Sequence, residues 1–148
     1  MNNKKTYKVA LTHTRFSYTG GIEKYIYSLV MRLLDAGHEV HYLAHRWEEF
    51  EHPNLHFHKI PWMRFPKSVR VHNFNRSLNR FLDENSFDIV HGFTKTSRQD
   101  IFTDGSGCLE EFIDATMANR SKFYRRMIRK LSPHQRAIES IESARFQE

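Results

Sequence analysis

Two adjacent glycines, Gly20 and Gly21, stand between an apolar stretch and a run with helical spacing. Glycine lets a backbone approach a ligand closely, and the free amides that begin a helix attract an anion. Glu23 and Lys24 follow in the first turn of the expected helix. The dinucleotide pattern G-x-G-x-x-G and the lysine of a P-loop are both absent. The loop is therefore either a place where a phosphate approaches or a tight turn that needs positive φ angles.

Two other residues have types that suit acid–base chemistry. His91 lies at the carboxyl end of the apolar stretch FDIVHGF, and doubly wound sheets bind ligands at such strand ends. A histidine held in the core is the alternative. Asp104, in the glycine-rich stretch IFTDGSG, would act as a base toward a hydroxyl group, although Asp-Gly is also a common turn dipeptide.

Histidines are frequent, and the stretch HPNLHFH brings His56 and His58 onto the same face of an expected strand. That spacing resembles part of a metal site. The stretch offers no cysteine and no carboxylate cluster at ligand spacing, however. We interpret these histidines as solvent-facing, and no metal ion is expected.

A basic segment, residues 119–131, follows in the last third of the chain. No acidic residue occurs between positions 115 and 138. At 100° per residue the apolar side chains share one side of a helix, and most basic side chains fall on the other. The basic residues of interest are Lys122, Arg125, Arg126, Arg129 and Lys130. The segment is either a solvated face over a packed stripe, a helix on an anionic membrane surface, or a nucleic-acid binder. No nucleic-acid motif accompanies it, so no nucleic acid is expected as a partner.

Apolar patterning alternates between strands and helices. Strands are predicted at 8–13, 38–45, 55–60 and 87–93, with helices after Gly21, around Phe74 and after Pro133. Gly37 suits the left-handed C-terminal cap of the first helix. Strands separated by helices are typical of a parallel sheet, so the predicted fold is α/β, a Rossmann-like, doubly wound, mostly parallel sheet.

Composition limits the remaining possibilities. The chain of 148 residues has a length typical of one domain, with a net charge of +6 that favours an anionic partner. Its single cysteine excludes an internal disulfide. No apolar run is long enough for a signal peptide or a membrane span. The protein is expected to be soluble or to sit on a surface.

The ordered set of motifs resembles the N-terminus of family 4 glycosyltransferases, which have the GT-B fold. In that family a first strand runs into Gly-Gly-x-Glu-Arg/Lys, then a helix, then Gly-His-x-Val. The chain has TGGIEK, the helix and AGHEV, and its stretch FDIVHGF matches the family's Asp-Ile-Val-His strand. The later stretch is most similar to the lipopolysaccharide-core α-glucosyltransferase branch, and the resemblance covers nearly the whole chain.

The resemblance implies a role for each candidate residue. Gly20 and Gly21, with Glu23 and Lys24, would lie beside the donor diphosphate and the acceptor sugar. Asp104 would be a catalytic or acceptor-positioning carboxylate, with His91 as a weaker catalytic candidate. Residues 119–131 would rest on the anionic inner-membrane surface, which places the protein in the cytoplasm as a peripheral protein. Transfer would retain the anomeric configuration, use a nucleotide-sugar as co-substrate, and need neither a metal nor another cofactor.

The chain also departs from the family. Family members carry a second, donor-binding domain with a Glu-x7-Glu motif, and the sequence contains no such pair. Residues 1–148 are therefore expected to be one incomplete N-terminal, acceptor-side domain, whose partner domain is lost, cut away or a separate chain. Alone, the chain is expected to be inactive. The competing hypothesis is a non-catalytic module that binds a membrane surface.

Overall fold

The computed structural model describes residues 5–62, 67–103, 133, 136–138, 140 and 141. The prediction for Asp104 and the predicted basic helix at 119–131 lie outside the described residues. The same holds for its basic residues Lys122, Arg125, Arg126, Arg129 and Lys130. Neither described helix is both long and apolar enough to cross a membrane.

The core is a five-stranded parallel sheet in the order β5-β3-β1-β6-β7. The strands are β1 (Lys8–Thr12), β3 (Glu39–Ala44), β5 (Leu55–Lys59), β6 (Ile89–Gly92) and β7 (Ile101–Phe102). Counted along the chain without the two strands of a separate small sheet, this order is 3-2-1-4-5, which is the order of a doubly wound sheet up to its fifth strand. The predicted fold class is confirmed.

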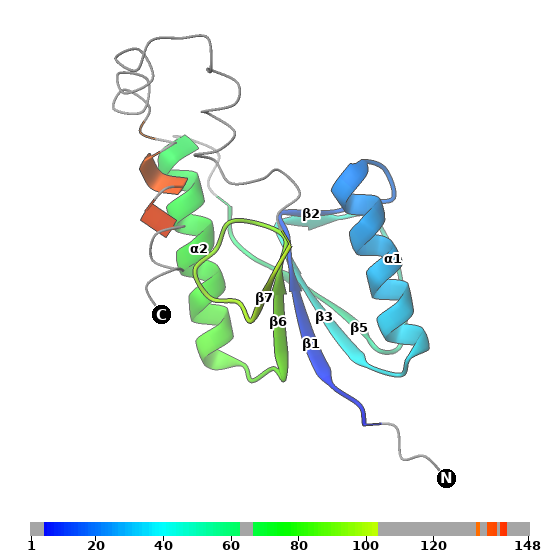
Figure 1. The fold of residues 1–148 in the computed structure, drawn as a ribbon. Helices are drawn as coiled ribbons and strands as arrows, with labels where there is room; N and C mark the ends of the chain where they lie inside the picture. Colours follow the sequence, from blue (N-terminus) through cyan, green and yellow to red (C-terminus); the bar gives the residue numbers. More distant parts are fainter. Residues whose placement is uncertain (1–4, 63–66, 104–132, 134–135, 139, 142–148) are drawn as a thin grey trace.

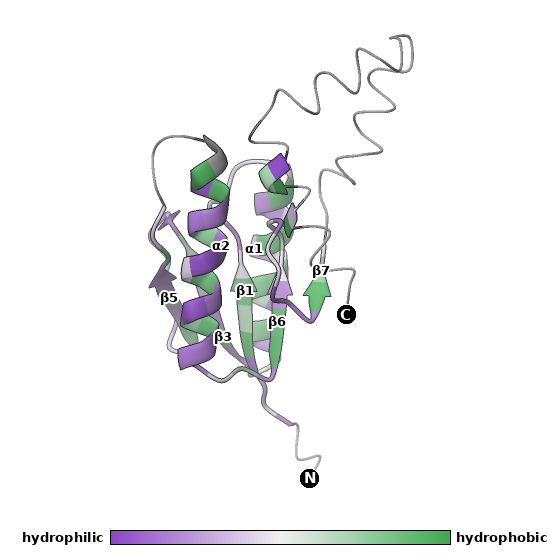
Figure 2. Cartoon of the chain, turned by 90° about the vertical axis from the view of Figure 1, so that its left-hand side faces the viewer, coloured by the Kyte–Doolittle hydropathy of each residue, from purple (hydrophilic) through white to green (hydrophobic). Residues whose placement is uncertain are grey.

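Two helices cover the two faces of this sheet (Figure 1). Helix α1 (Gly21–Asp35) buries Ile26, Val30 and Leu34 against one face. Helix α2 (Lys67–Glu84) buries Phe74, Leu78 and Leu82 against the other. Each such side chain contributes about 1.5–3 kcal/mol by leaving water. Figure 2 shows β1, β6 and β7 as largely hydrophobic strands, β5 as a hydrophilic strand, and a hydrophilic outer side of α2.

Strand β1 occupies the centre because it is apolar on both faces. Val9 and Leu11 pack in the cluster on the α1 side, whereas Ala10 packs in the cluster on the α2 side. A continuous apolar run such as this one is typical of a strand that is buried on both faces. Lys8 and Asp88 fix the entry of β1 beside β6. The backbone amide of Lys8 donates to the Asp88 carboxylate at 2.7 Å, and the Asp88 amide donates to the Lys8 carbonyl at 2.9 Å.

Gly37 ends α1 as predicted, with a φ angle of +84°. The Gly37 amide donates to the Leu34 carbonyl at 2.9 Å, and the His38 amide donates to the Leu33 carbonyl at 3.0 Å. These two bonds are those of the Schellman motif, which satisfies the last carbonyls of a helix. The chain turns directly into β3.

Two short strands, β2 (Arg15–Phe16) and β4 (Arg46–Trp47), form a small separate parallel sheet. They follow β1 and β3 and were not predicted. Phe16 is almost fully buried, and its ring centroid lies 4.9 Å from that of Tyr42. The segment that leads to the glycine pair is thereby packed against the main core.

Strands β6 and β7 are joined by residues 93–100, with no helix assigned between them. Such a connection is shorter than most parallel crossovers. The Gln99 side chain lies where a Cβ on Gly92 would stand, and its amide donates to the Thr96 carbonyl at 3.2 Å. Ala137 and Ile141 are buried, and Ile138 is half-buried.

Candidate functional site

A cavity of about 500 Å³ lies at the carboxyl ends of β1 and β6. Three segments form most of its wall: the residues after β1, the residues after β6, and the first turn of α1. Its lining residues are His13, Thr14, Gly21, Ile22, Glu23, Val71, Phe93, Thr94, Lys95, Phe102 and Ile138. The chain order reverses direction between β1 and β6, and doubly wound sheets bind ligands outside the strands at that switch point.

The two glycines have different tasks. Gly20 caps α1 with a φ angle of +111°, a conformation that favours glycine, and a side chain there would also meet the Glu23 carboxylate. Gly21 lines the cavity, and a Cβ added to it would have no neighbour within 4 Å among the described atoms. The tight-turn interpretation therefore applies to Gly20, whereas Gly21 leaves open space at the cavity, and a phosphate approach there stays a prediction.

His13 is a cavity residue that the sequence did not single out. Its Nδ1 atom lies 3.0 Å from the Thr94 hydroxyl oxygen. Burial lowers the pKa of His13, although the Glu23 carboxylate acts in the opposite direction. A neutral imidazole at neutral pH can accept a hydrogen bond or a proton from a bound hydroxyl group. The signal that would have found it is its position directly after a buried parallel strand.

His91 and Lys24 are described, but neither is among the residues that line this cavity. His91 stacks on Phe93 with ring centroids 4.3 Å apart, and its Nε2 atom lies 2.8 Å from the Thr103 hydroxyl oxygen. Burial lowers the pKa of His91. Lys24 is exposed on α1. The structure thus brings Gly21 and Glu23 together at the cavity, with Gly20 adjacent in the chain. The roles predicted for His91, Lys24 and Asp104 stay predictions.

Glu48 positions the loop that precedes the glycines. Its carboxylate accepts hydrogen bonds from the Ser17 hydroxyl at 2.7 Å, the Arg15 guanidinium at 3.0 Å and the Tyr18 amide at 3.1 Å. The Ser17 hydrogen bond, first among these contacts, lowers the pKa of Glu48. No local sequence pattern connects Glu48 with a loop some 30 positions earlier, so sequence reasoning missed it.

A second cavity of about 500 Å³ adjoins the first through Thr14 and is basic. Arg15, Arg46, Arg70, His45 and Trp62 complete its lining. The Arg70 guanidinium lies 4.8 Å from the centre of the Trp62 ring. Arg70 Nε and His45 Nδ1 are buried, and neither has a hydrogen-bond partner within the described part of the chain.

Unpaired nitrogens of this kind suit an anionic group. Arginine binds phosphate and carboxylate through a planar fork of N–H donors, so a wall with three arginines is chemically suited to an anion. Arg15 already contacts Glu48. Arg70 and Arg46 are therefore the residues that the cavity offers most directly to a ligand.

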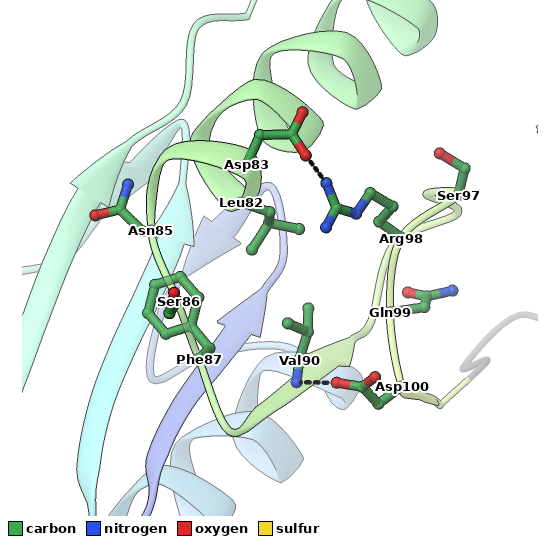
Figure 3. A pocket seen from close by; sticks show the side chains of 10 residues that line it. All are labelled: Leu82, Asp83, Asn85, Ser86, Phe87, Val90, Ser97, Arg98, Gln99 and Asp100. Atoms are coloured by element: carbon green, nitrogen blue, oxygen red, sulfur yellow. Dashed lines mark hydrogen bonds and ion pairs between the residues drawn. The ribbon is translucent and has the colours of Figure 1, made fainter.

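A larger cavity of about 720 Å³ lies between the end of α2 and residues 97–100 (Figure 3). Asp83 pairs with Arg98 across it, and the Val90 amide donates to the Asp100 carboxylate at 2.7 Å. It lies at the amino ends of β6 and β7, which is the opposite edge of the sheet from the switch point. We therefore do not assign the substrate to this cavity.

Comparison with known sequences decides the family. The sequence model of Glycosyltransferase Family 4 matches residues 19–97, which run from the glycine loop to the connection after β6. The chain belongs to glycosyltransferase family 4. The match includes the cavity residues from Gly21 to Lys95, whereas His13, Thr14, Phe102 and Ile138 of the cavity wall lie outside it.

Solved structures agree on the fold of this family 4 chain. The crystal structure of WaaG, a glycosyltransferase involved in lipopolysaccharide biosynthesis, matches with a TM-score of 0.75 and 20% sequence identity. The match covers 92% of this chain and 35% of the WaaG chain. No curated protein sequence matches.

Proposed function

We propose that this chain supplies the acceptor side of sugar transfer from a nucleotide-sugar to a glycolipid or polysaccharide. The observation that carries the proposal is the cavity at the switch point, which is lined by the first turn of α1 in a family 4 glycosyltransferase chain. Lipopolysaccharide core is the proposed acceptor class, and the involvement of WaaG in lipopolysaccharide biosynthesis supports it. Because the chain spans 35% of the WaaG chain, the activity of the whole protein belongs to the proposal.

The positively and negatively charged groups of the cavity would bind different parts of the two substrates. Gly21 and the amides at the start of α1 would face the donor diphosphate, because the positive end of the helix dipole favours an anion. Lys95 lines the same cavity and adds a cationic group. Glu23 would accept hydrogen bonds from acceptor hydroxyl groups, a role in which its negative charge is useful. His13 would accept a hydrogen bond from the same sugar.

The remaining chemistry follows the family resemblance. Transfer would retain the anomeric configuration and would need no metal. Asp104 and His91 stay the proposed catalytic residues, and a donor-binding domain with Glu-x7-Glu would bind the nucleotide. Such a domain would act together with this chain, either covalently joined or as a partner.

The basic cavity refines the acceptor class. Arg15, Arg46 and Arg70 lie beside the sugar cavity, and the two share Thr14. An acceptor that carries phosphate groups would place its sugar in the first cavity and a phosphate in the second. We therefore propose a phosphorylated glycolipid rather than a neutral glycan.

Acceptor binding and sugar transfer are tested in two separate experiments. In NMR titrations, a phosphorylated lipopolysaccharide-core oligosaccharide should shift the amide signals of Gly21 and Thr94. The dephosphorylated oligosaccharide should bind more weakly. If neither compound shifts these signals, the proposal is wrong. Incubation with nucleotide-sugars and this acceptor should give no transfer by the chain alone, and transfer once a family 4 donor-binding domain is added.

A second candidate function rests on the basic segment 119–131, within a stretch free of acidic residues. The chain would bind the anionic inner-membrane surface as a peripheral protein, with or without catalysis. Flotation with anionic vesicles, but not with neutral vesicles, is the expected result. Charge reversal at Arg125, Arg126 and Arg129 should abolish flotation. If the reversed variant floats like the wild type, the segment is a solvated face only.

A further inference from the structure

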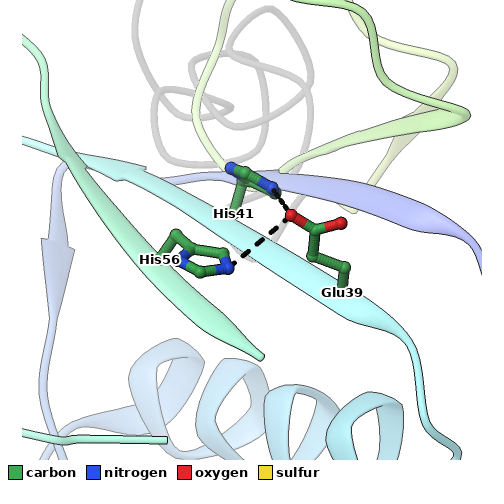
Figure 4. A group of neighbouring side chains, drawn as sticks. All are labelled: Glu39, His41 and His56. Carbon is green, nitrogen blue, oxygen red and sulfur yellow. Dashed lines mark hydrogen bonds and ion pairs between the residues drawn. The ribbon is translucent and has the colours of Figure 1, made fainter. Parts of the chain in front are cut away.

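Four ionisable side chains gather on the α2 face of the sheet, away from both ligand cavities. Glu39 and His41 are two positions apart on β3, and His56 and His58 are two positions apart on β5, so the two side chains of each pair lie on the same face of the sheet. The parallel register pairs His41 with His56, so all four side chains leave the sheet on the same side. Figure 4 shows His41, His56 and Glu39 turned toward one another.

Three of these side chains have the spacing of metal ligands. Glu39 Oε1 lies 2.8 Å from His41 Nε2 and 3.6 Å from His56 Nε2. All three ligand atoms lie within 4.8 Å of one another. Two ligand atoms on the same zinc ion are roughly 3 to 4 Å apart, because each bond is about 2.0 to 2.2 Å long. Small side-chain rotations would bring the three atoms around one ion.

His58 contacts the ring nitrogen of His41 that faces away from Glu39. Its Nε2 atom lies 2.8 Å from His41 Nδ1, and the two rings stack with centroids 5.0 Å apart. A histidine that binds a metal through Nε2 carries its proton on Nδ1 and donates it to a neighbouring acceptor. His58 Nε2 is such an acceptor, so it would fix both the orientation and the tautomer of His41.

We infer that Glu39, His41 and His56 form a binding site for a divalent transition-metal ion of the zinc class, with His58 as the outer partner of His41. Two imidazoles and a carboxylate are ligands that Zn²⁺ accepts, and a water molecule would fill the fourth position. The side chains of Glu39 and His56 are each 44% exposed, so an ion can enter from solvent.

Lys8 lies near the same cluster, and its positive charge acts against a bound cation.

The role of the ion would be structural. Glu39 is the first residue of β3, at the edge of the sheet opposite the switch point. Strand β5 pairs with β3 alone in the described sheet. An ion held by His56 on one side and by Glu39 and His41 on the other would tie β5 to the sheet. The inference is independent of the proposed sugar transfer.

Isothermal titration of the tag-free full chain with Zn²⁺ tests the site. One ion per chain is expected. His56→Ala and Glu39→Gln should each weaken Zn²⁺ binding at least about tenfold, and His58→Gln by about 10- to 100-fold. His72→Ala, at an exposed histidine of α2, is the matched control and should bind like the wild type. His56→Ala and Glu39→Gln replace partly exposed side chains and are expected to fold, so the test does not depend on replacing the buried His41.

NMR of the imidazole nitrogens gives a second readout. Zn²⁺ should move His41 and His56 into the tautomer that carries its proton on Nδ1, and should raise the unfolding temperature of the wild type but not of His56→Ala. Zinc binding that His56→Ala and Glu39→Gln leave unchanged would overturn the inference. So would an equal loss in His72→Ala, or no saturable binding.

Discussion

His13 Nδ1 lies 3.0 Å from the Thr94 hydroxyl oxygen, so the residue after β1 contacts the second residue after β6. These two segments form facing parts of the wall of the switch-point cavity. The contact joins positions that are 81 residues apart. It therefore couples the shape of the cavity to the pairing of the central strands.

Thr94→Val should destabilise the protein by about 1 kcal/mol, since it removes one side-chain hydrogen bond but keeps the size of the residue. His13 would lose its partner, and acceptor binding should weaken. Urea unfolding measures the first effect and NMR titration the second. Thr94→Ser keeps the hydroxyl group and should behave like the wild type. A Val variant as stable as the Ser variant would show that the contact contributes nothing.

The glycine pair offers a matched comparison. Gly20→Ala should cost about 1–3 kcal/mol of folding free energy, because a φ angle of +111° is strained for any side chain. Gly21→Ala should lie within about 1 kcal/mol of the wild type, since its φ is ordinary and its surroundings are open. Gly21→Ala should nevertheless weaken acceptor or donor binding. Equal losses of stability in both variants would contradict these separate tasks.

Acidification should destabilise the protein through His13. Its folded pKa lies below the ordinary value of 6.5, so the unfolded chain takes up this proton at a higher pH than the folded chain does. The contribution is complete above pH 6.5 and is lost as the pH falls through 6.5 toward the folded pKa. Glu23 from α1 and the backbone of Phe93 oppose the shift but do not reverse it.

Unfolding free energies at pH 7.5 and pH 5.5 should therefore differ more for the wild type than for His13→Asn. An NMR titration of the His13 ring gives the same quantity directly. An apparent pKa at or above 6.5 for that ring would contradict the prediction.

Glu48→Ala should loosen the segment before the glycine pair, because three hydrogen bonds from residues 15, 17 and 18 lose their acceptor. The expected result is faster amide hydrogen exchange at Tyr18, with little change in the strands of the main sheet. Glu49→Ala, at the neighbouring exposed residue, is the control, since Tyr18 reaches only its backbone carbonyl. Unchanged exchange at Tyr18 would show that Glu48 does not hold the loop.

The elements of the main sheet follow from the sequence wherever the apolar pattern is long. The continuous apolar run from Val9 to Leu11 is typical of a strand buried on both faces, and the four-residue spacing of Ile26 and Val30 is typical of the inner side of a helix. Gly37 predicted the end of that helix through its conformational preference alone. Strands β2, β4 and β7 were missed, because two residues are too few to carry a period.

The site was only partly predictable, because its members come from segments distant in sequence. The sequence identifies Gly21 and Glu23 because a glycine pair followed by an acid in the first helical turn is a recognisable local pattern. Glu48 stands in no such pattern, because the loop that it contacts is 30 positions away. His56 is exposed as predicted, but His58 is half-buried, where its ring lies 4.8 Å from that of Phe81. The carboxylate that the histidine stretch lacked comes from Glu39, on the neighbouring strand.

The central position of β1 has a consequence for the order of folding. Its first partner, β3, follows about 31 residues later, but Val9 also pairs with Ile89 of β6, 80 positions along the chain. During synthesis, one edge of β1 therefore stays unpaired until β6 emerges. Long sequence separation slows such pairing, and an uncovered apolar strand edge promotes aggregation. Refolding of this protein should be slow and sensitive to concentration, and nascent chains that end before Gly92 should be held by chaperones rather than fold.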